Sequence, residues 1–318
     1  MAYDATPRPG STADVRDPGP QPYHRLLRNP VTSGWMVVLG AFAVLAGWMF
    51  ASLVIQTIRL SIHKDPEGTI SWFGLLATNL TLIVLIPLTM LVATRLNRQT
   101  PGLLSSVVGR IRWRPLAWFG LVAIAVELLM LGVIKVGGVE LLGGNGGVAA
   151  DAAAVIAVTL LTSTFQAAGE EYFFRGYLLQ AVGAFVRSSV IAVLVTTVLF
   201  TMAHGVWPWE SPALFLDRFA FGLVAGMLVL RTGGLEAAIA AHAANNVMTF
   251  IYAALTDSVN ASLNASDASW SLVAVDVSKF VLFGVVAVLL ARKQNLATTC
   301  DLPLVHAPVV GGPGKRLV

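Results

Sequence analysis

Eight apolar runs, each near 20 residues long, divide this 318-residue sequence. A helix needs about 20 predominantly apolar residues to cross the hydrocarbon core of a bilayer. Only 12% of the residues are charged, whereas an average soluble domain has about 25%. The sequence therefore predicts an all-α integral membrane protein with about eight transmembrane helices. The expected spans are residues 34–58, 70–94, 116–135, 152–169, 189–207, 212–230, 233–255 and 270–291.

Lysine and arginine are distributed unevenly between the two ends of these spans. With the N-terminus in the cytoplasm, 16 of the 21 fall on the cytoplasmic side, 3 on the opposite side and 2 inside spans. The positive-inside rule then predicts a multi-pass protein of the cell membrane with both termini cytoplasmic. We expect a flexible cytoplasmic arm over 1–33, a helical membrane domain over 34–292 and a cytoplasmic tail over 293–318.

The same composition excludes other classes of protein. The net charge of +4 is small and its positive residues are scattered, so no nucleic-acid partner is expected. Cys300 is the single cysteine, which excludes a disulfide framework and a cysteine metal cluster within one chain. The expected surroundings are the lipid bilayer and a membrane-bound substrate or partner.

Ionisable side chains in apolar runs are costly in a bilayer and are candidates for function. Glu170 and Glu171 stand together at the end of the fourth run, and Arg175 follows. Glu171 and Arg175 are four residues apart and can form an ion pair on a helix. Glu170 then has no obvious partner, which suits a general base. The alternative is an interfacial ion pair that ends a span.

Two histidines lie within other predicted spans. One ends the pattern Phe200-x-x-x-His204, and the other begins the pattern His242-x-x-x-Asn246, whose polar residues share a helix face. Each pattern alone is compatible with hydrogen bonding between helices. Together they favour a hydrolytic centre, because imidazole is a common ligand of zinc and a catalytic zinc typically takes three protein ligands plus water. Two histidines with a carboxylate or amide oxygen could hold such a metal, and a free glutamate could serve as the base.

The remaining polar residues in the spans are less informative. Asp276 and Lys279 are three residues apart and are expected to neutralise each other. Asp217 and Arg218 lie near a span end, either at the interface or facing the site. Glu127 has no visible partner. Pro87 is expected to kink the second helix.

Three motifs in order resemble the signature of a known family. They are Glu170-Glu171-x-x-x-Arg175, Phe200-x-x-x-His204 and His242-x-x-x-Asn246. Their order and spacing are similar to those of the CAAX prenyl-protease and bacteriocin-processing family (CPBP, or Abi), over a core of about residues 115–255.

The resemblance implies an all-helical membrane endopeptidase, with its active site among the fourth, fifth and seventh helices. Its substrates would be membrane-associated proteins or peptides, such as prenylated CAAX-type proteins. By the family's pattern, Glu170 activates the attacking water, and Glu171 and Arg175 support the site. His204, His242 and Asn246 would hold a metal or the developing oxyanion. The metal implied is a divalent ion, zinc, with His204, His242, Asn246 and Glu170 as its expected ligands. The motifs leave open whether a metal takes part.

The expected fourth span conflicts with this site. A helix that ends at residue 169 would leave Glu170 near the cytoplasmic face, whereas His204 lies 17 residues beyond Arg187, about 25 Å along a helix. The apolar residues 172–186 offer a solution if the helix continues through them. A helical hairpin that turns near Arg187 would place Glu170 and His204 at equal depth.

Two alternatives come from other classes of protein. One is a non-enzymatic membrane protein for bacteriocin immunity or scaffolding, although such a protein has no need of Glu170, His204 and His242 together. The other is a proton-coupled transporter, in which buried Glu and His relay protons. No internal repeat supports a transporter, and a flux assay in proteoliposomes would separate it from a hydrolase.

Overall fold

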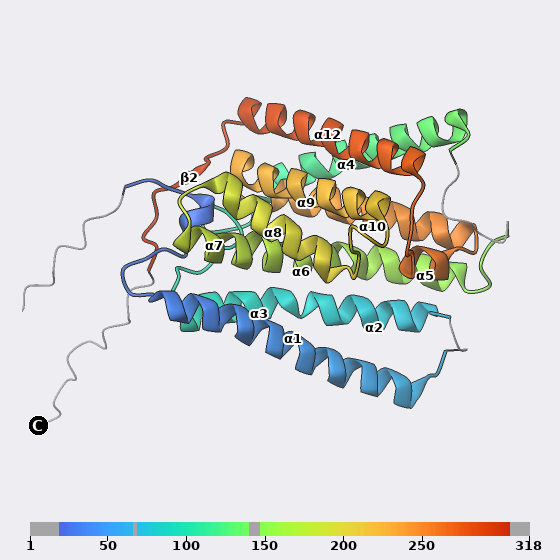
Figure 1. Ribbon diagram of the computed structural model, residues 1–318, viewed down its shortest axis with the longest axis horizontal. Helices are drawn as coiled ribbons and strands as arrows, with labels where there is room; N and C mark the ends of the chain where they lie inside the picture. The colour runs from blue at the N-terminus through green and yellow to red at the C-terminus, as the bar shows by residue number, and fades with distance from the viewer. Residues whose placement is uncertain (1–18, 66–68, 140–146, 306–318) are drawn as a thin grey trace, which may run out of the picture.

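The computed structural model describes residues 19–65, 69–139 and 147–305, and in these ranges the fold is all-α apart from one short strand pair (Figure 1). The predicted fold class is confirmed. The elements are β1 (Gln21–Pro22), η1 (Tyr23–Arg25), α1 (Gly34–Ile62), α2 (Trp72–Ile83), α3 (Leu85–Leu91), η2 (Val92–Leu96), α4 (Trp113–Gly137), α5 (Ala152–Val158), η3 (Thr159–Ser163), α6 (Thr164–Glu171), η4 (Tyr172–Leu178), α7 (Leu179–Phe185), α8 (Ser189–Ala203), α9 (Pro212–Thr232), α10 (Glu236–Leu255), α11 (Val259–Leu263), α12 (Trp270–Lys293) and β2 (Thr299–Cys300).

Seven helices of the described ranges are long and apolar enough to cross a membrane. The fifth expected span, residues 189–207, is the exception and forms only α8, which has 15 residues. The helix ends because His204 caps it and Gly205 then takes a left-handed conformation with φ of 68°. α8 is thus shorter than the roughly 20 residues that a full crossing needs.

The fourth span differs most from its expected bounds. It does not end at residue 169 but continues from Ala152 to Phe185, a helix of 34 residues built from α5, η3, α6, η4 and α7. At 1.5 Å per residue this helix is roughly 50 Å long, more than the 30 Å hydrocarbon core. Arg175, one of the 16 basic residues predicted on the cytoplasmic side, lies inside it.

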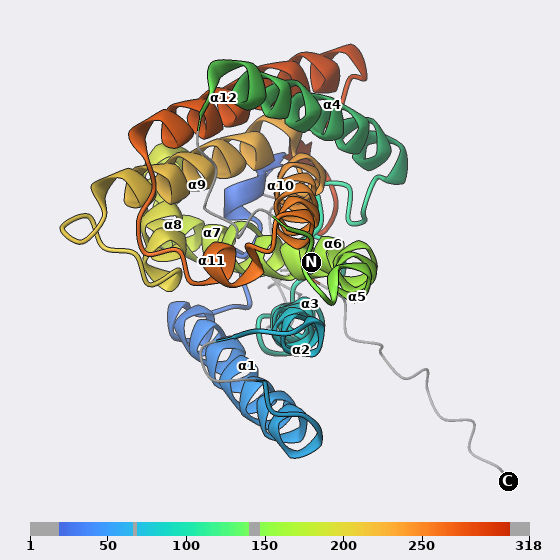
Figure 2. The same cartoon turned by 90° about the vertical axis from the view of Figure 1, so that its right-hand side faces the viewer.

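The helices pack side by side in layers (Figures 1 and 2). α4 and α12 form one side, and α9 and α10 pack against them. The long helix of α5, α6 and α7 lies next, with α8 beside α9. α2 contacts α6 on the other side, and α1 packs against α2 and α3. The long helix is therefore central to the bundle.

The second span is interrupted where Pro87 was expected to kink it. α2 ends at Ile83 and α3 begins at Leu85. Proline has no N–H to donate to the carbonyl four residues earlier, and its ring clashes with that carbonyl. Beside this break, the carbonyl of Leu82 approaches α6 so closely that a β-carbon on Gly169 would overlap its oxygen.

Gly169→Ala is expected to destabilise the protein by about 1–3 kcal/mol, because the added methyl group must push α6 away from the backbone of α2. A lower Tm in detergent is the measurement. Gly132→Ala on α4 is the matched control, since its β-carbon would meet nothing within 4 Å. Equal Tm values for the two variants would contradict the close approach of α2 and α6.

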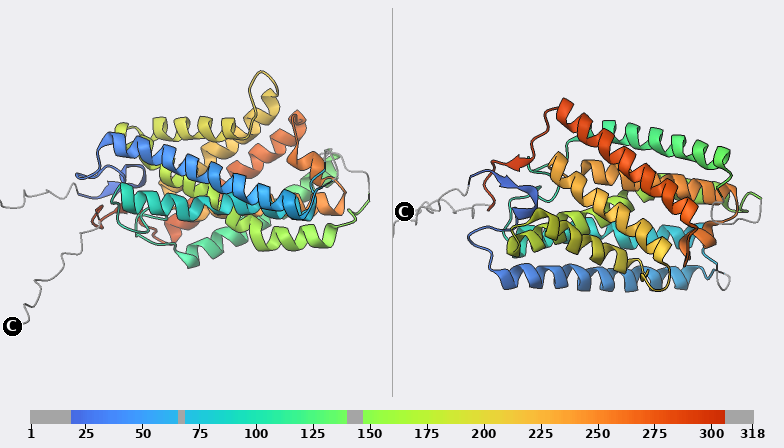
Figure 3. Two further views of the ribbon diagram at one scale, coloured as in Figure 1. Left: turned by 90° about the horizontal axis from the view of Figure 1, so that it is seen from below. Right: turned by 45° about the horizontal axis from the view of Figure 1, so that its top comes forward.

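The N-terminal and C-terminal segments meet at one end of the bundle (Figure 3). β1 pairs with β2 in antiparallel register, Gln21 opposite Cys300. Tyr23, Leu26 and Leu27 are fully buried, so residues 19–33 pack on the bundle and do not extend from it as the predicted flexible arm. Residues 1–18 of that arm and 306–318 of the predicted tail lie outside the described residues.

Candidate active site

Glu170 and His204 meet at the same depth in the bundle. Glu170 precedes the end of α7 at Phe185 by 15 residues, and His204 follows the start of α8 at Ser189 by 15. The helical hairpin between them brings Nε2 of His204 to 3.8 Å from Oε2 of Glu170. The convergence that the sequence required is therefore present in the structure.

The imidazole of His204 is held through its other nitrogen. Nδ1 lies 2.8 Å from the carbonyl oxygen of Phe200, which can only accept a hydrogen bond. We therefore assign the proton to Nδ1, which leaves the lone pair of Nε2 directed toward Glu170. The ring of Phe200 also packs on His204, with 4.4 Å between ring centroids. Phe200 thus fixes both the orientation and the tautomer of His204.

Gln166 connects Glu170 to Asn246. Its amide nitrogen donates to Oε1 of Glu170, and its amide oxygen accepts from Nδ2 of Asn246 at 2.9 Å. Sequence reasoning missed Gln166. The signal was available, because Gln166 is a polar residue in an apolar run, four positions before Glu170 and therefore on the same helix face.

Glu171 is the centre of a second buried group. Its Oε1 accepts from Nη1 of Arg175 at 2.8 Å, which confirms the predicted ion pair. The same oxygen lies 2.8 Å from Nδ1 of His242. Glu171 is fully buried, and Arg175 is 1% exposed. The carboxylate of Glu171 thus orients His242, whereas Glu170 faces His204.

Arg175 is also enclosed by aromatic rings. The carbon of its guanidinium lies 4.0 Å from the ring centroid of Phe200 and 5.4 Å from that of Phe221. A guanidinium over an aromatic face is attracted by the ring quadrupole. Arg175 lies in η4, a π-helical segment that follows Glu171 directly. Such π-helical segments are frequent at functional sites.

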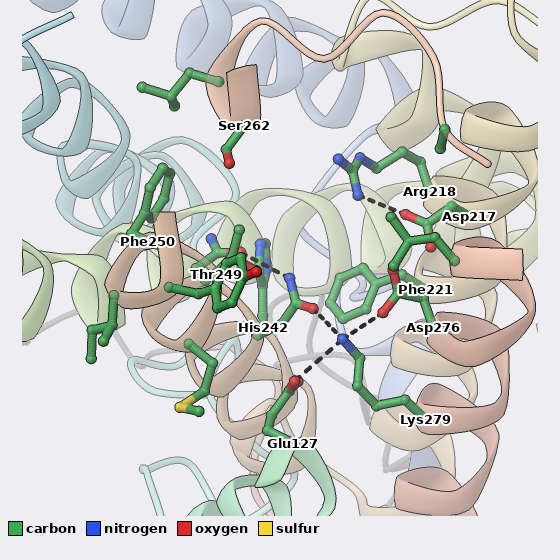
Figure 4. Close-up of a pocket in the computed structure, with 18 of the residues that line it drawn as sticks. Glu127, Asp217, Arg218, Phe221, His242, Thr249, Phe250, Ser262, Asp276 and Lys279 are labelled. Atoms are coloured by element: carbon green, nitrogen blue, oxygen red, sulfur yellow. Dashed lines mark hydrogen bonds and ion pairs between the residues drawn. The ribbon is translucent and has the colours of Figure 1, made fainter. Parts of the chain in front are cut away.

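The Glu170–His204 pair and the His242 side chain held by Glu171 face one cavity of about 600 Å³ (Figure 4). Its lining includes Glu170, His204, His242 and Asn246. The rest of the wall is mostly apolar, with side chains from α2, α4, α9, α10, α11 and α12. Volumes of about 300–1,000 Å³ are typical of small-ligand sites. Four of the six predicted site residues therefore border the cavity, and Glu171 and Arg175 lie behind them.

A charged group occupies the wall of the cavity drawn in Figure 4. Lys279 lies 2.8 Å from Asp276, as expected, and 3.3 Å from Glu127. It also donates to Oδ1 of Asn245 at 2.8 Å. Glu127, which had no visible partner in the sequence, is thus paired with a lysine from another helix. Asp217 and Arg218 border the same cavity, so they face the site.

The predicted zinc ligands come from three helices in the described part of the chain: Glu170 from α6, His204 from the end of α8, and His242 and Asn246 from α10. No group of three His, Cys, Asp or Glu residues there is arranged to hold a metal ion. Glu170 and His204 form a pair. His242 directs Nδ1 to Glu171, and Asn246 directs its amide nitrogen to Gln166. Each histidine thus uses Nδ1 and keeps Nε2 free. Zinc at these residues stays a prediction, and we derive no step through a metal.

The fold and the site together define a polytopic α-helical membrane protein with a buried glutamate–histidine centre. Residues 152–248 match the family described as "Type II CAAX prenyl endopeptidase Rce1-like". The recognition made from the three motifs is therefore confirmed over this segment, which contains all six predicted site residues.

A similar protein is "Uncharacterized protein YyaK" of Bacillus subtilis (strain 168), which is 32% identical over 108 residues. The match covers 33% of this chain and 36% of YyaK. The chain thus spans about a third of the length of the curated relative that it matches. The likeness therefore leaves the activity of the whole protein to a proposal.

Proposed function

We propose that the chain is an intramembrane endopeptidase that hydrolyses peptide bonds of membrane-associated substrates. The observation that carries this function is the pair Glu170 and His204, 3.8 Å apart at the wall of a mostly apolar cavity. A gap of 3.8 Å is too long for a direct hydrogen bond, and one water molecule beside both side chains can contact each. The matched segment belongs to a family described as endopeptidases, which agrees with this chemistry.

In this mechanism Glu170 is the general base. Its carboxylate takes a proton from the water, whose oxygen attacks the carbonyl carbon of the scissile bond. Nε2 of His204 accepts a hydrogen bond from the same water and orients it. The proton then passes to the leaving amine as the C–N bond breaks. Gln166 holds Glu170 in place through the amide bond to Oε1.

His242 and Asn246 stabilise the negative oxygen that develops on the substrate. With Nδ1 engaged by Glu171, a protonated His242 can donate through Nε2 to this oxygen. Asn246 uses one amide hydrogen for Gln166 and has a second one to donate. The contact with Glu171 fixes the orientation of the His242 ring. Glu171 and Arg175 are therefore positioning residues.

The substrate class follows from the walls of the cavity and from the family. A mostly apolar lining suits a lipidated peptide, and a prenylated CAAX-type protein is the substrate that we propose. We place the protein in the cell membrane with both termini in the cytoplasm, because lysine and arginine gather at that end of the spans. That zinc is a cofactor of this protein stays a prediction.

The purified wild-type protein is expected to cleave a quenched-fluorescent farnesylated CAAX peptide in maltoside detergent. In ¹⁸O-labelled water, one heavy oxygen should enter the new carboxyl group, as hydrolysis requires. Glu210→Ala, an exposed glutamate outside the cavity, serves as the control and should cleave normally. No cleavage by the wild type would contradict the proposed function.

The same assay tests zinc through a chelator and the metal content of the protein. If zinc is bound by His204 and His242, chelation stops cleavage, and His204→Ala and His242→Ala each lose metal. Cleavage that survives the chelator, with equal metal content in all three proteins, would remove zinc and leave the glutamate–histidine pair as the catalytic unit.

A further inference from the structure

Arg218 lies beside the catalytic pair, although none of the three motifs includes it. One helical turn away, Gly222 of α9 packs against α8, where its β-carbon would stand 3.0 Å from Thr197 and 3.4 Å from Phe200. The two helices are consecutive and antiparallel. One turn further toward their connection, α9 presents Arg218 and α8 ends at His204. Both residues line the same cavity.

The guanidinium of Arg218 has donors to spare. Its Nη1 donates to Oδ2 of Asp217 at 2.6 Å, the one hydrogen bond that Arg218 makes within the described residues. A guanidinium has five N–H donors. The side chain is 33% exposed, whereas Asp217 is 3% exposed and anchors it from behind. The unused donors of Arg218 are therefore accessible from the cavity.

Lys279, the other cation in the wall of the cavity, has a partner for each of its donors. Its ammonium has three donors, and it has three partners: Glu127, Asp276 and Asn245. The two carboxylates more than balance its charge. An anionic group that enters the cavity would thus be repelled at Lys279 and attracted at Arg218. A planar guanidinium with free donors matches the geometry of a carboxylate in particular.

We propose that Arg218 binds a carboxylate of the peptide substrate close to the scissile bond. This inference rests on the proposed endopeptidase function and adds a determinant of specificity to it. Asp217 is the counter-ion that keeps Arg218 charged, and it uses one of the five donors, so the others can bind a second carboxylate. The bound carboxylate is either the chain terminus of the substrate or an acidic side chain near the cleavage point.

Three peptides with the same lipid and scissile bond test the inference. One ends in a free carboxylate and has no acidic residue, one is its C-terminal amide, and the third is that amide with an aspartate two residues after the scissile bond. For the wild type we expect KM to be roughly 10- to 100-fold higher for the plain amide than for a carboxylate peptide. A low KM for the peptide with the free C-terminal carboxylate identifies the chain terminus as the bound group. A low KM for the aspartate peptide identifies an acidic side chain.

Arg218→Gln should remove this preference. We expect all three peptides to show the high KM of the amide with little change in kcat, because the lost contact exists before and during the reaction. Arg218→Lys should restore part of the preference. Arg231→Gln, at the exposed end of the same helix, is the matched control and should keep the wild-type KM values.

Two results would overturn the inference. The first is that the wild type cleaves all three peptides with the same KM. The second is that Arg218→Gln raises KM by the same factor for the amide peptide and for the carboxylate peptides. Binding of the uncleaved peptides to Glu170→Gln, followed by fluorescence anisotropy, separates this failure from that of the proposed function. A preference for carboxylate there, without cleavage by the wild type, would keep the Arg218 site and remove the protease.

Discussion

Glu170→Ala is expected to lower kcat for peptide cleavage by about 10²–10⁴-fold, because the water then has no base within reach. Its Oε2 is the carboxylate oxygen that faces Nε2 of His204, at 3.8 Å. The nearby Glu171 cannot replace it, since its Oε1 is engaged by Arg175 and His242 and the residue is fully buried behind the cavity wall. The measurement is the rate of release of the fluorescent fragment at saturating peptide.

Loss of activity counts only if the protein is intact. Glu170 contributes one hydrogen bond with Gln166 and no buried ion pair with a permanent cation, so the Tm of Glu170→Ala should stay close to that of the wild type. Glu170→Gln keeps the shape of the side chain and should be nearly as inactive. Full activity in either variant would remove Glu170 from the role of base.

Arg175→Ala is expected to cost about 3–5 kcal/mol of stability, because it leaves the carboxylate of Glu171 buried without its cation. Glu171 is fully buried and Arg175 is 1% exposed, so water cannot replace the lost partner. The variant also empties the space between Phe200 and Phe221. Thermal unfolding in detergent is the measurement, and low yield of folded protein is the accompanying sign.

A double-mutant cycle distinguishes the ion pair from simple loss of packing. Glu171→Ala/Arg175→Ala should cost less than the sum of the two single changes, since neither charge is then left alone. Arg231→Ala, whose side chain is exposed, should change the Tm little. Additive losses in the cycle would show that the pair contributes through packing and not through charge.

The site could be predicted from the sequence because its residues recur at helical spacing within single helices. Glu171 and Arg175 share a turn, and so do Phe200 and His204. The depth argument even corrected the expected end of the fourth span, since Glu170 and His204 could meet only if the helix continued to a turn near Arg187. Here function constrained the secondary structure more than hydropathy did.

Contacts between side chains of different helices could not be predicted from spacing within one helix. Lys279 of α12 bonds Glu127 of α4 and Asn245 of α10, and nothing in the local sequence specifies which helices become neighbours. The burial of Tyr23 could not be predicted for the same reason. Its segment is polar and rich in proline, and its packing depends on the loop that provides the carbonyl of Leu104. Such features follow from the tertiary arrangement alone.

The pairing of Gln21 with Cys300 makes the chain, in polymer terms, a closed ring of nearly 280 residues. The entropy lost on closing a loop grows only with the logarithm of its length, as about (3/2)RT ln n, yet for a ring of this size it exceeds what a two-residue ladder returns. The burial of Tyr23, Leu26 and Leu27 has to supply the difference. The ring therefore closes only once the bundle offers that surface.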